Sequence, residues 1–283
     1  MAVRLGLIGD NIGRSRSPRL HRLAGELCGL SVSYEPLVPP DLDLDFDAVF
    51  TRCQAEGFRG LNITYPYKEK VVARLRIEDT RVRAIAACNT VTFEEGGPLG
   101  FNTDCSGFVS AFRENFPDAA PGIVAMAGAG GVGKAVGFAL ASLGAAELRL
   151  FDGDFAKADA LSVVLRQAAP AMRVTVAGSV GEAVSDADGV VNCTPLGMVG
   201  YPGSAIPKPL LAGRSWAFDA VYTPVETEFL QDARSKGLEV MSGYELFFHQ
   251  GVDAFRIFTG CEVDQAALKA ALDRDRAPDR AAS

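Results

Sequence analysis

The chain has 283 residues, 48% of them hydrophobic and 22% charged, with a formal net charge of −7. A chain of this length buries roughly three quarters of its unfolded surface, so its core needs no disulfides or metals. The acidic balance argues against a nucleic-acid surface, and the lack of any apolar run of about 18 residues argues against a membrane span.

Segments that favour strands and helices alternate in the first part of the chain. Strands are predicted over residues 3–9, 31–38 and 58–64, followed by a pair of strands over 88–93 and 98–102. Helices are predicted over 18–29, 45–56, 66–75 and 79–86. Ser17 is expected to cap the first of these helices, and Pro66 to occupy the first position of the third. This alternation predicts a mostly parallel sheet with helices on both faces.

A second alternation follows a Pro/Ala/Gly-rich linker at 117–122. Helices over 131–143 and 154–168 alternate there with the strand-like stretches "IVAMAG", "ELRLFD", "RVTVAG", "GVVNCT" and "WAFDAVY". We therefore place a second domain at 107–240. Two further helices are predicted at 243–259 and 264–273, and the polar tail 276–283 is expected to be disordered.

The cysteines and histidines predict no metal centre. Six cysteines stand singly, without a C-x-x-C pair, and the chain has only two histidines. This pattern is typical of reduced core thiols. The N-terminus begins with a strand-like run and lacks the basic and apolar regions of a signal peptide. These features together predict a cytoplasmic protein.

The stretch "MAGAGGVGKAVGFALASLG" carries glycines in the pattern G-x-G-x-x-G. An apolar strand precedes the pattern and a helix follows it, which is the context that dinucleotide binding requires. One glycine makes the tight turn, one lets the backbone approach a pyrophosphate, and one packs helix on strand. The helix N-terminus then offers N–H groups to the phosphates. The predicted cofactor loop contains Gly128, Ala129, Gly130, Gly131, Val132 and Gly133.

The next strand ends at Asp152, 19 residues after Gly133. An acid at this place is expected to bond the adenosine ribose hydroxyls. Lys157 is the nearest cation, and no arginine stands just after the strand. A 2′-phosphate would meet carboxylates, and like charges in a desolvated site cost several kcal/mol. The residues thus favour NAD over NADP, unless Asp152 serves only as a helix N-cap.

Polar residues gather where the strands of the first domain end. Ligands of open α/β sheets bind beyond the carboxyl ends of the strands. Amide and hydroxyl groups both donate and accept hydrogen bonds, which suits a polyhydroxylated small molecule. Taken singly, each residue also fits a structural role as a cap, a turn residue or a surface charge. The set comprises Ser15, Ser17, Asn62, Thr64, Lys68, Asn89, Asn102 and Asp104.

Eight motifs occur in a fixed order from Leu5 to about Gly260: "SRSPRLH", "NITYPYK", "CNTV", "GFNTDCSGF", "GAGGVGKA", "NCTPLGM", "DAVYTPVETEFL" and "HQGVDAFRIFTG". In these motifs the chain resembles the shikimate dehydrogenase family, and in particular its quinate/shikimate dehydrogenase branch. The resemblance implies an α/β fold of two domains with a cleft between them. A substrate domain would span 1–106, a Rossmann-type NAD-binding domain 107–240, and C-terminal helices at 241–275 would return to the first domain.

The resemblance also implies roles for individual residues. Lys68 and Asp104 would form the catalytic pair. Substrate contacts would come from Ser15, Ser17, Asn62, Thr64, Asn89, Tyr222 and Gln250. Cofactor contacts would come from the glycine loop, Asp152, Lys157, Thr194, Pro195, Met198, Val221 and Gly243. The implied partner is NAD with a cyclic polyhydroxy carboxylate as substrate, the working form is a monomer or homodimer, and neither nucleic acid nor membrane is involved.

Lys68 raises a chemical question, because a lysine accepts a proton only in its neutral form. In the predicted helix over 66–75 it would lie in the first turn, where the macrodipole disfavours the ammonium form. Partial burial would act in the same direction, whereas an ionised Asp104 nearby would oppose both. We expect Lys68 to act as the acid–base group and Asp104 to orient it and the substrate hydroxyl.

Three features bear on which branch of the family the chain resembles. "FDGD" stands where NADP users carry an arginine, which fits the NAD-using branch. Ser17 resembles the shikimate-preferring enzymes, because quinate users often have threonine there. "GYELF" replaces the usual "GLGML" before the terminal helix. The alternatives left open are a dehydrogenase of quinate or of an aminoshikimate-like ring acid, and a non-catalytic NAD-binding regulator, which would need neither Lys68 nor Asp104.

Overall fold

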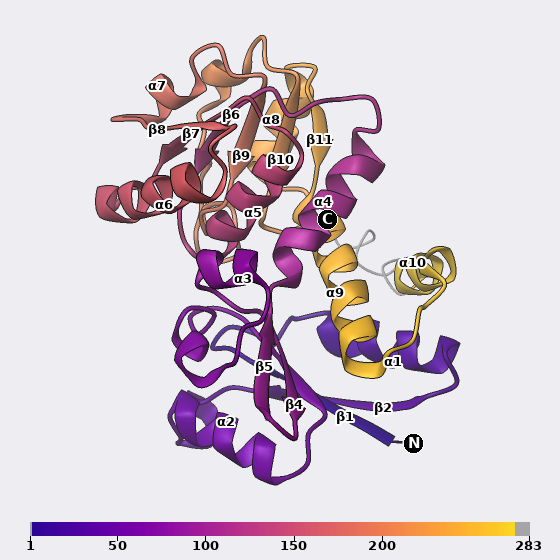
Figure 1. Ribbon diagram of the computed structural model, residues 1–283. Coiled ribbons are helices and arrows are strands. Elements are labelled where there is room, and N and C mark those ends of the chain that lie inside the picture. The colour runs from indigo at the N-terminus through magenta and orange to yellow at the C-terminus, as the bar shows by residue number, and fades with distance from the viewer. Residues whose placement is uncertain (1, 275–283) are drawn as a thin grey trace. The chain divides into compact units, whose positions relative to one another are not determined.

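The computed structural model describes residues 2–274, which divide into two compact units (Figure 1). Unit 1 runs from the N-terminal strand to Thr103 and resumes at Gln250, and unit 2 comprises Asp104–His249. The chain thus crosses between units at 103–104 and 249–250, compared with the predicted crossings at 106–107 and 240–241. The tail 276–283 lies outside the described residues. Within 2–274, no helix is long and apolar enough to cross a membrane.

Unit 1 contains a five-stranded sheet in the order β2-β1-β3-β4-β5. Its first three strands pair in parallel, and its last two form an antiparallel hairpin that pairs antiparallel with β3. The sheet is therefore mixed, whereas the alternation of elements predicted a mostly parallel one. The strands are β1 (Ala2–Ile8), β2 (Ser31–Leu37), β3 (Gly60–Ile63), β4 (Thr90–Glu94) and β5 (Gly97–Phe101).

Helices cover both faces of the unit 1 sheet because side chains alternate along β1. Ile8 packs with Phe46 and Phe50 of α2 (Phe46–Ala55). Leu5 and Leu7 point the other way and pack with residues of α9 (Gly243–Thr259). The other helices of the unit are α1 (Ser17–Leu27), α3 (Thr80–Ile85) and α10 (Gln265–Arg274), with short 3₁₀ turns η1 (Pro40–Leu42) and η2 (Lys70–Arg74).

The helix predicted over 66–75 is wrong. The chain turns at Tyr65 and Pro66, whose peptide bond is cis, and only η2 is helical beyond it. Tyr67 stacks on the Phe46 ring at 4.8 Å, and Val71 is fully buried in the same apolar cluster. Packing of this segment against α2 therefore overrides the local preference that the proline suggested.

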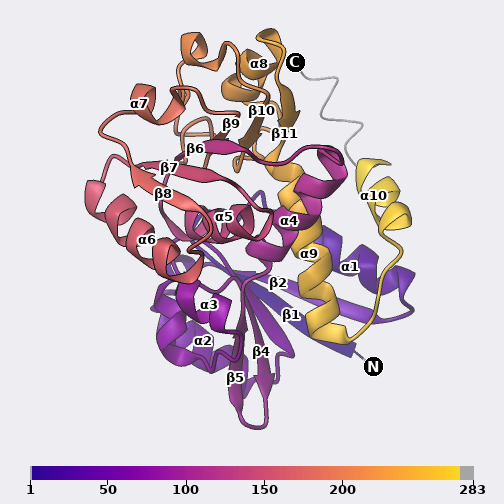
Figure 2. The same ribbon diagram turned by 45° about the horizontal axis from the view of Figure 1, so that its top comes forward.

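Unit 2 contains a six-stranded sheet in the order β11-β10-β9-β6-β7-β8, with every pair parallel. Figure 2 shows β6, β7 and β8 side by side. Sequential strands run outward from β6 in one direction and from β9 in the other, as in Rossmann folds. The strands are β6 (Ile123–Ala127), β7 (Glu147–Phe151), β8 (Arg173–Val176), β9 (Gly189–Asn192), β10 (Trp216–Asp219) and β11 (Glu239–Met241).

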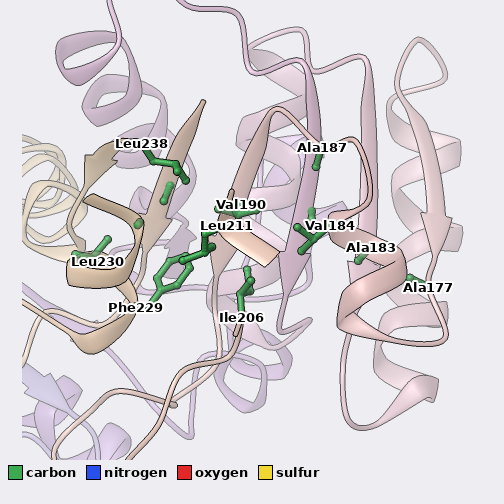
Figure 3. Close-up of a cluster of buried hydrophobic side chains, with 13 residues drawn as sticks. Ala177, Ala183, Val184, Ala187, Val190, Ile206, Leu211, Phe229, Leu230 and Leu238 are labelled. Atoms are coloured by element: carbon green, nitrogen blue, oxygen red, sulfur yellow. The ribbon is translucent and has the colours of Figure 1, made fainter. Parts of the chain in front are cut away.

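Apolar clusters fill both faces of the unit 2 sheet. Figure 3 shows one of them, where Val184 and Phe229 pack with Val190 of β9. On β10, Ala217 belongs to this cluster, while Trp216 and Phe218 make edge-to-face contacts with aromatic residues of α4. The helices are α4 (Thr103–Asn115), α5 (Gly131–Ser142), α6 (Phe155–Ala168), α7 (Val180–Val184) and α8 (Glu228–Ser235), with the 3₁₀ turn η3 (Lys208–Leu211).

Candidate functional site

The glycine loop follows β6, at the point where the strand order of unit 2 reverses. In open α/β sheets this switch point is where ligands bind, beyond the carboxyl ends of the strands. Gly130 is the N-cap of α5, so the first N–H groups of that helix face the loop. The sequence pattern and the topology therefore indicate the same place.

The three glycines of the pattern differ in what a side chain would meet. Gly128 has φ +99° and lies so close to β9 that a Cβ would stand 2.6 Å from the carbonyl carbon of Cys193. A Cβ on Gly133 would stand 2.1 Å from the carbonyl oxygen of Gly128. A Cβ on Gly130 would meet nothing within 4 Å. Two glycines are thus required by packing, and the third keeps the space in front of the helix open for a ligand.

Asp152 ties the end of β7 to this loop. Its Oδ2 accepts from the backbone N–H of Ala129 and its Oδ1 from that of Asp154, both at 2.8 Å. The N-cap of α6 is Asp154, which accepts from the N–H of Ala156. The interpretation of Asp152 as the cap is therefore wrong. The exposed Lys157 lies 3.8 Å from the Asp154 carboxylate.

A buried polar network, which the sequence analysis did not predict, supports the loop after β9. Asn192 Oδ1 accepts from the N–H and hydroxyl of Thr194, while its Nδ2 donates to Asp219 Oδ1 at 2.9 Å. Asp219 also accepts from the Thr227 hydroxyl at 2.6 Å and from the N–H of Val221 at 3.0 Å. The side chain is fully buried, and this burial raises the pKa of Asp219 to about 6, although the three hydrogen bonds lower it.

The remaining predicted residues of unit 2 lie near the carboxyl ends of its strands. Val221 follows β10 and is buried. Pro195 and Met198 belong to the loop after β9, where Met198 N–H donates to the Pro195 carbonyl at 3.0 Å. Gly243 begins α9, and a Cβ there would stand 2.5 Å from the Ala220 carbonyl oxygen, so packing alone requires a glycine. The half-buried Tyr222 stacks on the Phe247 ring at 5.2 Å.

Three of the predicted substrate residues meet in one network of unit 1. Asn62 Nδ2 donates to the Asn89 carbonyl at 3.2 Å, and Asn89 Nδ2 lies 3.4 Å from Gln250 Oε1. The backbone N–H of Thr103 donates to Asn89 Oδ1 at 2.7 Å. These bonds hold the ends of β3, the loop before β4 and α9 together.

Tyr34 and His21 complete this network, and sequence reasoning missed both. The Tyr34 hydroxyl donates to Asn62 Oδ1 at 2.9 Å, and the His21 ring stacks on Tyr34 at 4.8 Å. Burial lowers the pKa of His21 to about 3, so the imidazole is neutral at physiological pH. Tyr34 sits in a strand pattern and His21 in a helix pattern, and only the fold brings them together.

Ser15 and Ser17 contact each other through their hydroxyls at 3.2 Å. The prediction that Ser17 caps α1 is wrong, because Arg16 is the N-cap and Ser17 is the first helical residue. Instead, the Ser15 hydroxyl accepts from the N–H of Ser17 at 3.3 Å. Ser15 provides the hydroxyl acceptor at the start of the helix, which leaves the Ser17 side chain outside the capping role.

Thr64 and Lys68 flank the turn after β3 and are both half-buried. The Lys68 carbonyl accepts from the N–H of Cys88 at 2.8 Å, which fixes the turn to the segment before β4. Because the segment is not an α-helix, the expected effect of a helix macrodipole on Lys68 has no basis. Asp104 is buried in the first turn of α4, a helix that the sequence analysis did not predict. Lys68 belongs to unit 1 and Asp104 to unit 2, and their pairing stays a prediction.

Two segments of the chain match models of known protein families. Residues 7–91 match the family model of the shikimate dehydrogenase substrate binding domain. Residues 243–272 match the model of the shikimate 5′-dehydrogenase C-terminal domain. The first match contains Asn62 and Lys68, and the second contains Gln250.

Whole-chain relatives include enzymes of both cofactor types. The chain is 38% identical to a quinate/shikimate dehydrogenase (NAD(+)) of Corynebacterium efficiens, over 95% of this chain and 97% of the relative. It is also 38% identical to a shikimate dehydrogenase (NADP(+)) of Arthrobacter sp., over 94% and 92%. Quinate dehydrogenase from Corynebacterium glutamicum in complex with NAD has a TM-score of 0.88 at 37% identity, over 96% of this chain and 98% of that one.

Proposed function

This chain belongs to the shikimate dehydrogenase family, and from that premise we propose that it is an NAD-dependent oxidoreductase interconverting shikimate and 3-dehydroshikimate, and also quinate and 3-dehydroquinate. The observation that carries the proposal is the hydrogen bond from the Ala129 N–H to the Asp152 carboxylate, which ties Asp152 to the glycine loop at the switch point of unit 2. We place the enzyme in the cytoplasm, because its six cysteines are free thiols. We also propose that it works as a monomer or homodimer.

The residues of the glycine loop fit a dinucleotide. The open space at Gly130 and the N–H groups at the start of α5 suit a pyrophosphate. The Asp152 carboxylate is fixed in place by two backbone N–H groups, so it is preorganised to accept from ribose hydroxyls. The neighbouring Asp154 adds a second negative charge. Relatives of both cofactor types are equally similar overall, so NAD is favoured here by these two carboxylates.

Other residues of unit 2 would line the rest of the cofactor site. Thr194 is held by Asn192, and Val221 is held by Asp219, so both backbone segments are fixed before a ligand arrives. Pro195 and Met198 lie on the loop that follows β9, and Gly243 is the first residue of α9. When bound, the nicotinamide supplies the hydride acceptor for alcohol oxidation. Lys157 pairs with Asp154 and would meet the cofactor only at its adenosine end.

In unit 1 the polar network would bind the ring acid. Both donors of the Asn62 amide are already used, on the Asn89 carbonyl and the Thr90 hydroxyl. Its Oδ1 accepts one hydrogen bond from Tyr34, so the remaining lone pair of Oδ1 would accept a hydrogen bond from a substrate hydroxyl. Ser15 and Ser17 offer hydroxyls that suit a carboxylate. Thr64, Asn89, Gln250 and, from unit 2, Tyr222 are the other proposed substrate residues.

Lys68 and Asp104 would carry the proton chemistry. Oxidation of a secondary alcohol releases one proton, and we assign its acceptance to the Lys68 amine. Asp104 is buried at the start of α4. It would orient the ammonium formed on Lys68 and the substrate hydroxyl.

Initial rates with shikimate and with quinate, each with NAD and with NADP, test the proposal. We expect NAD reduction with shikimate to be fast and NADP reduction to be slow with either acid. Faster turnover of quinate would show that Ser17 does not decide the substrate. Faster turnover with NADP would contradict the role of Asp152. Tight NAD binding without turnover of either acid would favour a different ring acid or a regulator.

A further inference from the structure

Helix α4 and the first two turns of α9, both in unit 2, bring three metal-ligating side chains together. Glu114 lies near the end of α4, and Glu245 and His249 lie one turn apart on α9. Their ligand atoms all lie within 4.8 Å of one another. The start of α9 runs beside α4 in both views of the ribbon (Figures 1 and 2). The spacing i, i+4 places Glu245 and His249 on one face of their helix.

The His249 imidazole points into this cluster from a buried position. Its side chain is only 7% exposed, and its Nε2 lies 2.7 Å from Glu114 Oε2. Despite this short distance, Nε2 makes no hydrogen bond, because the N–H···O geometry is not met. A buried nitrogen without a hydrogen-bond partner is costly and calls for a ligand.

An ion pair alone does not account for this arrangement. A protonated imidazole in an ion pair directs its N–H at the carboxylate oxygen, because the hydrogen bond weakens steeply when misaligned. Here Nε2 and Oε2 lie 2.7 Å apart without that alignment. Two atoms that bind one tetrahedral Zn²⁺ at about 2.0–2.2 Å lie about 3.3–3.5 Å apart, so a cation bound between Nε2 and Oε2 would need them to separate by less than about 1 Å.

We propose that Glu114, Glu245 and His249 form a Zn²⁺ site that links α4 to α9. One imidazole and two carboxylates suit a borderline cation, and the three ligands leave a position for water. Glu114 is half exposed, so the site is open to solvent on one side. Along α4, Glu114 lies about 15 Å from Asp104 at 1.5 Å per residue. The site therefore serves to stabilise the helix pair and takes no part in the proton transfer.

Zn²⁺ titration of the full-length, tag-free protein by calorimetry tests the site. We expect one Zn²⁺ per chain in the wild type. Glu114→Gln, Glu245→Gln and His249→Gln should each weaken binding by at least about tenfold, since even supporting residues of metal sites cost that much. Asp159→Asn, which removes an exposed carboxylate on α6, a different helix of unit 2, should leave the affinity unchanged.

Co²⁺ absorption separates this site from the cysteines. Ligation by nitrogen and oxygen gives weak visible bands, whereas thiolate ligation adds an intense near-ultraviolet band. We expect only the weak bands, and we expect them to disappear in Glu114→Gln, whose exposed side chain can be changed without loss of the fold. Undetectable binding would overturn the proposal. So would binding that all three ligand variants retain, or binding that alkylation of the thiols abolishes.

The thermal stability of the protein tests whether Zn²⁺ stabilises the packing of α4 against α9. Removal of Zn²⁺ by a chelator should lower the Tm of the wild type and leave the Tm of Glu114→Gln unchanged, while kcat with shikimate changes by less than about twofold. A wild-type Tm that does not respond to Zn²⁺ would contradict the link between α4 and α9.

Discussion

The two units build their proposed binding regions in different ways. In unit 2, the backbone of one short segment forms most of the proposed cofactor site, because Gly128, Gly130 and Gly133 shape the loop between β6 and α5. In unit 1, side chains from separate segments form the proposed substrate site, because Asn62, Asn89 and Gln250 are joined by hydrogen bonds. A backbone-shaped site tolerates little change of volume, whereas a side-chain network loses function in graded steps. Substitutions in each unit can test this contrast.

Lys68→Met should have the largest effect. It removes the proposed proton acceptor, and general acid–base groups contribute about 10²- to 10⁴-fold to rate. We expect kcat with shikimate and NAD to fall within this range, while the Kd for NAD and the Tm stay as in the wild type. Steady-state kinetics and NAD fluorescence titration measure the two effects.

Lys70→Met is the matched control in the same segment. Lys70 forms an exposed ion pair with Asp47 at 3.0 Å, and such pairs contribute little. Its kcat should therefore stay within about twofold of the wild type. If Lys68→Met turned over like the wild type, the catalytic assignment would be wrong.

Gly133→Ala should come next, and Gly130→Ala provides its counterpart. The added Cβ at 133 would overlap the Gly128 carbonyl, a backbone atom that cannot rotate away, so we expect about 3 kcal/mol or more of destabilisation. At 130 the Cβ meets no protein atom, so stability should be unchanged while NAD binding weakens. Urea unfolding and NAD titration separate these outcomes. Equal stability loss in both variants would contradict the distinction.

Asp219 should make the stability of unit 2 depend on pH. Its pKa is raised from 3.8 to about 6 in the folded state, so the folded chain binds more protons than the unfolded chain between these values. The stabilisation from this group is fully present below pH 4 and is lost as the pH rises through about 6, by up to about 3 kcal/mol.

Asp219→Asn removes that dependence while keeping an acceptor for the N–H of Val221. The difference in unfolding free energy, wild type minus variant, should therefore decrease as the pH rises from 4 to 7. Urea unfolding at each pH measures it. A difference that is constant over this range would refute the raised pKa.

Asp152→Asn should change cofactor preference. It removes the negative charge that faces the ribose and weakens the bond from the Ala129 N–H, so we expect the KM for NAD to rise about tenfold, corresponding to about 1.4 kcal/mol, and that for NADP to rise less. Asp154→Asn is the comparison variant, because asparagine is an equally good N-cap and the change removes only the second of the two negative charges. If both variants shifted the KM for NAD alike, the negative charge, and not the hydrogen bond between Asp152 and Ala129, would decide the cofactor preference.

Tyr34→Phe should have the smallest effect. It removes one buried hydrogen bond to Asn62, worth about 0.5–1.5 kcal/mol, without changing the ring that stacks on His21. We expect a matching loss of unfolding free energy in urea and a modest rise in the KM for shikimate. A rise in KM without any loss of stability would mean that Tyr34 contacts the substrate directly.

The sequence predicted the features that depend on local pattern. The strand before Gly128, the helix after it and the position of Asp152 at the end of β7 follow from apolar periodicity and glycine spacing. The Rossmann strand order and the family are confirmed by the topology and the relatives. The strand, the helix and the position of Asp152 can be predicted from the sequence because residues close along the chain determine them.

The features that depend on contacts distant in sequence were not predictable. Pro66 suggested a helix start, but the burial of Tyr67 and Val71 against α2 set the backbone instead. Ser17 fits the composition of an N-cap, yet the helix begins one residue earlier. Asn192 and Asp219 meet across two strands, so no spacing marks them as partners. The roles of Lys68 and Asp104 stay predictions.

The discontinuity of unit 1 has a consequence for synthesis on the ribosome. Leu5 and Leu7 are covered by Phe258, whose carbonyl accepts from Arg59 Nε at 3.0 Å. That partner is translated only after the whole of unit 2, which takes on the order of 10 s at roughly 5–20 residues per second. During this interval one face of the nascent unit 1 sheet is not covered by α9. A chaperone that recognises apolar strands could bind the nascent chain at that face.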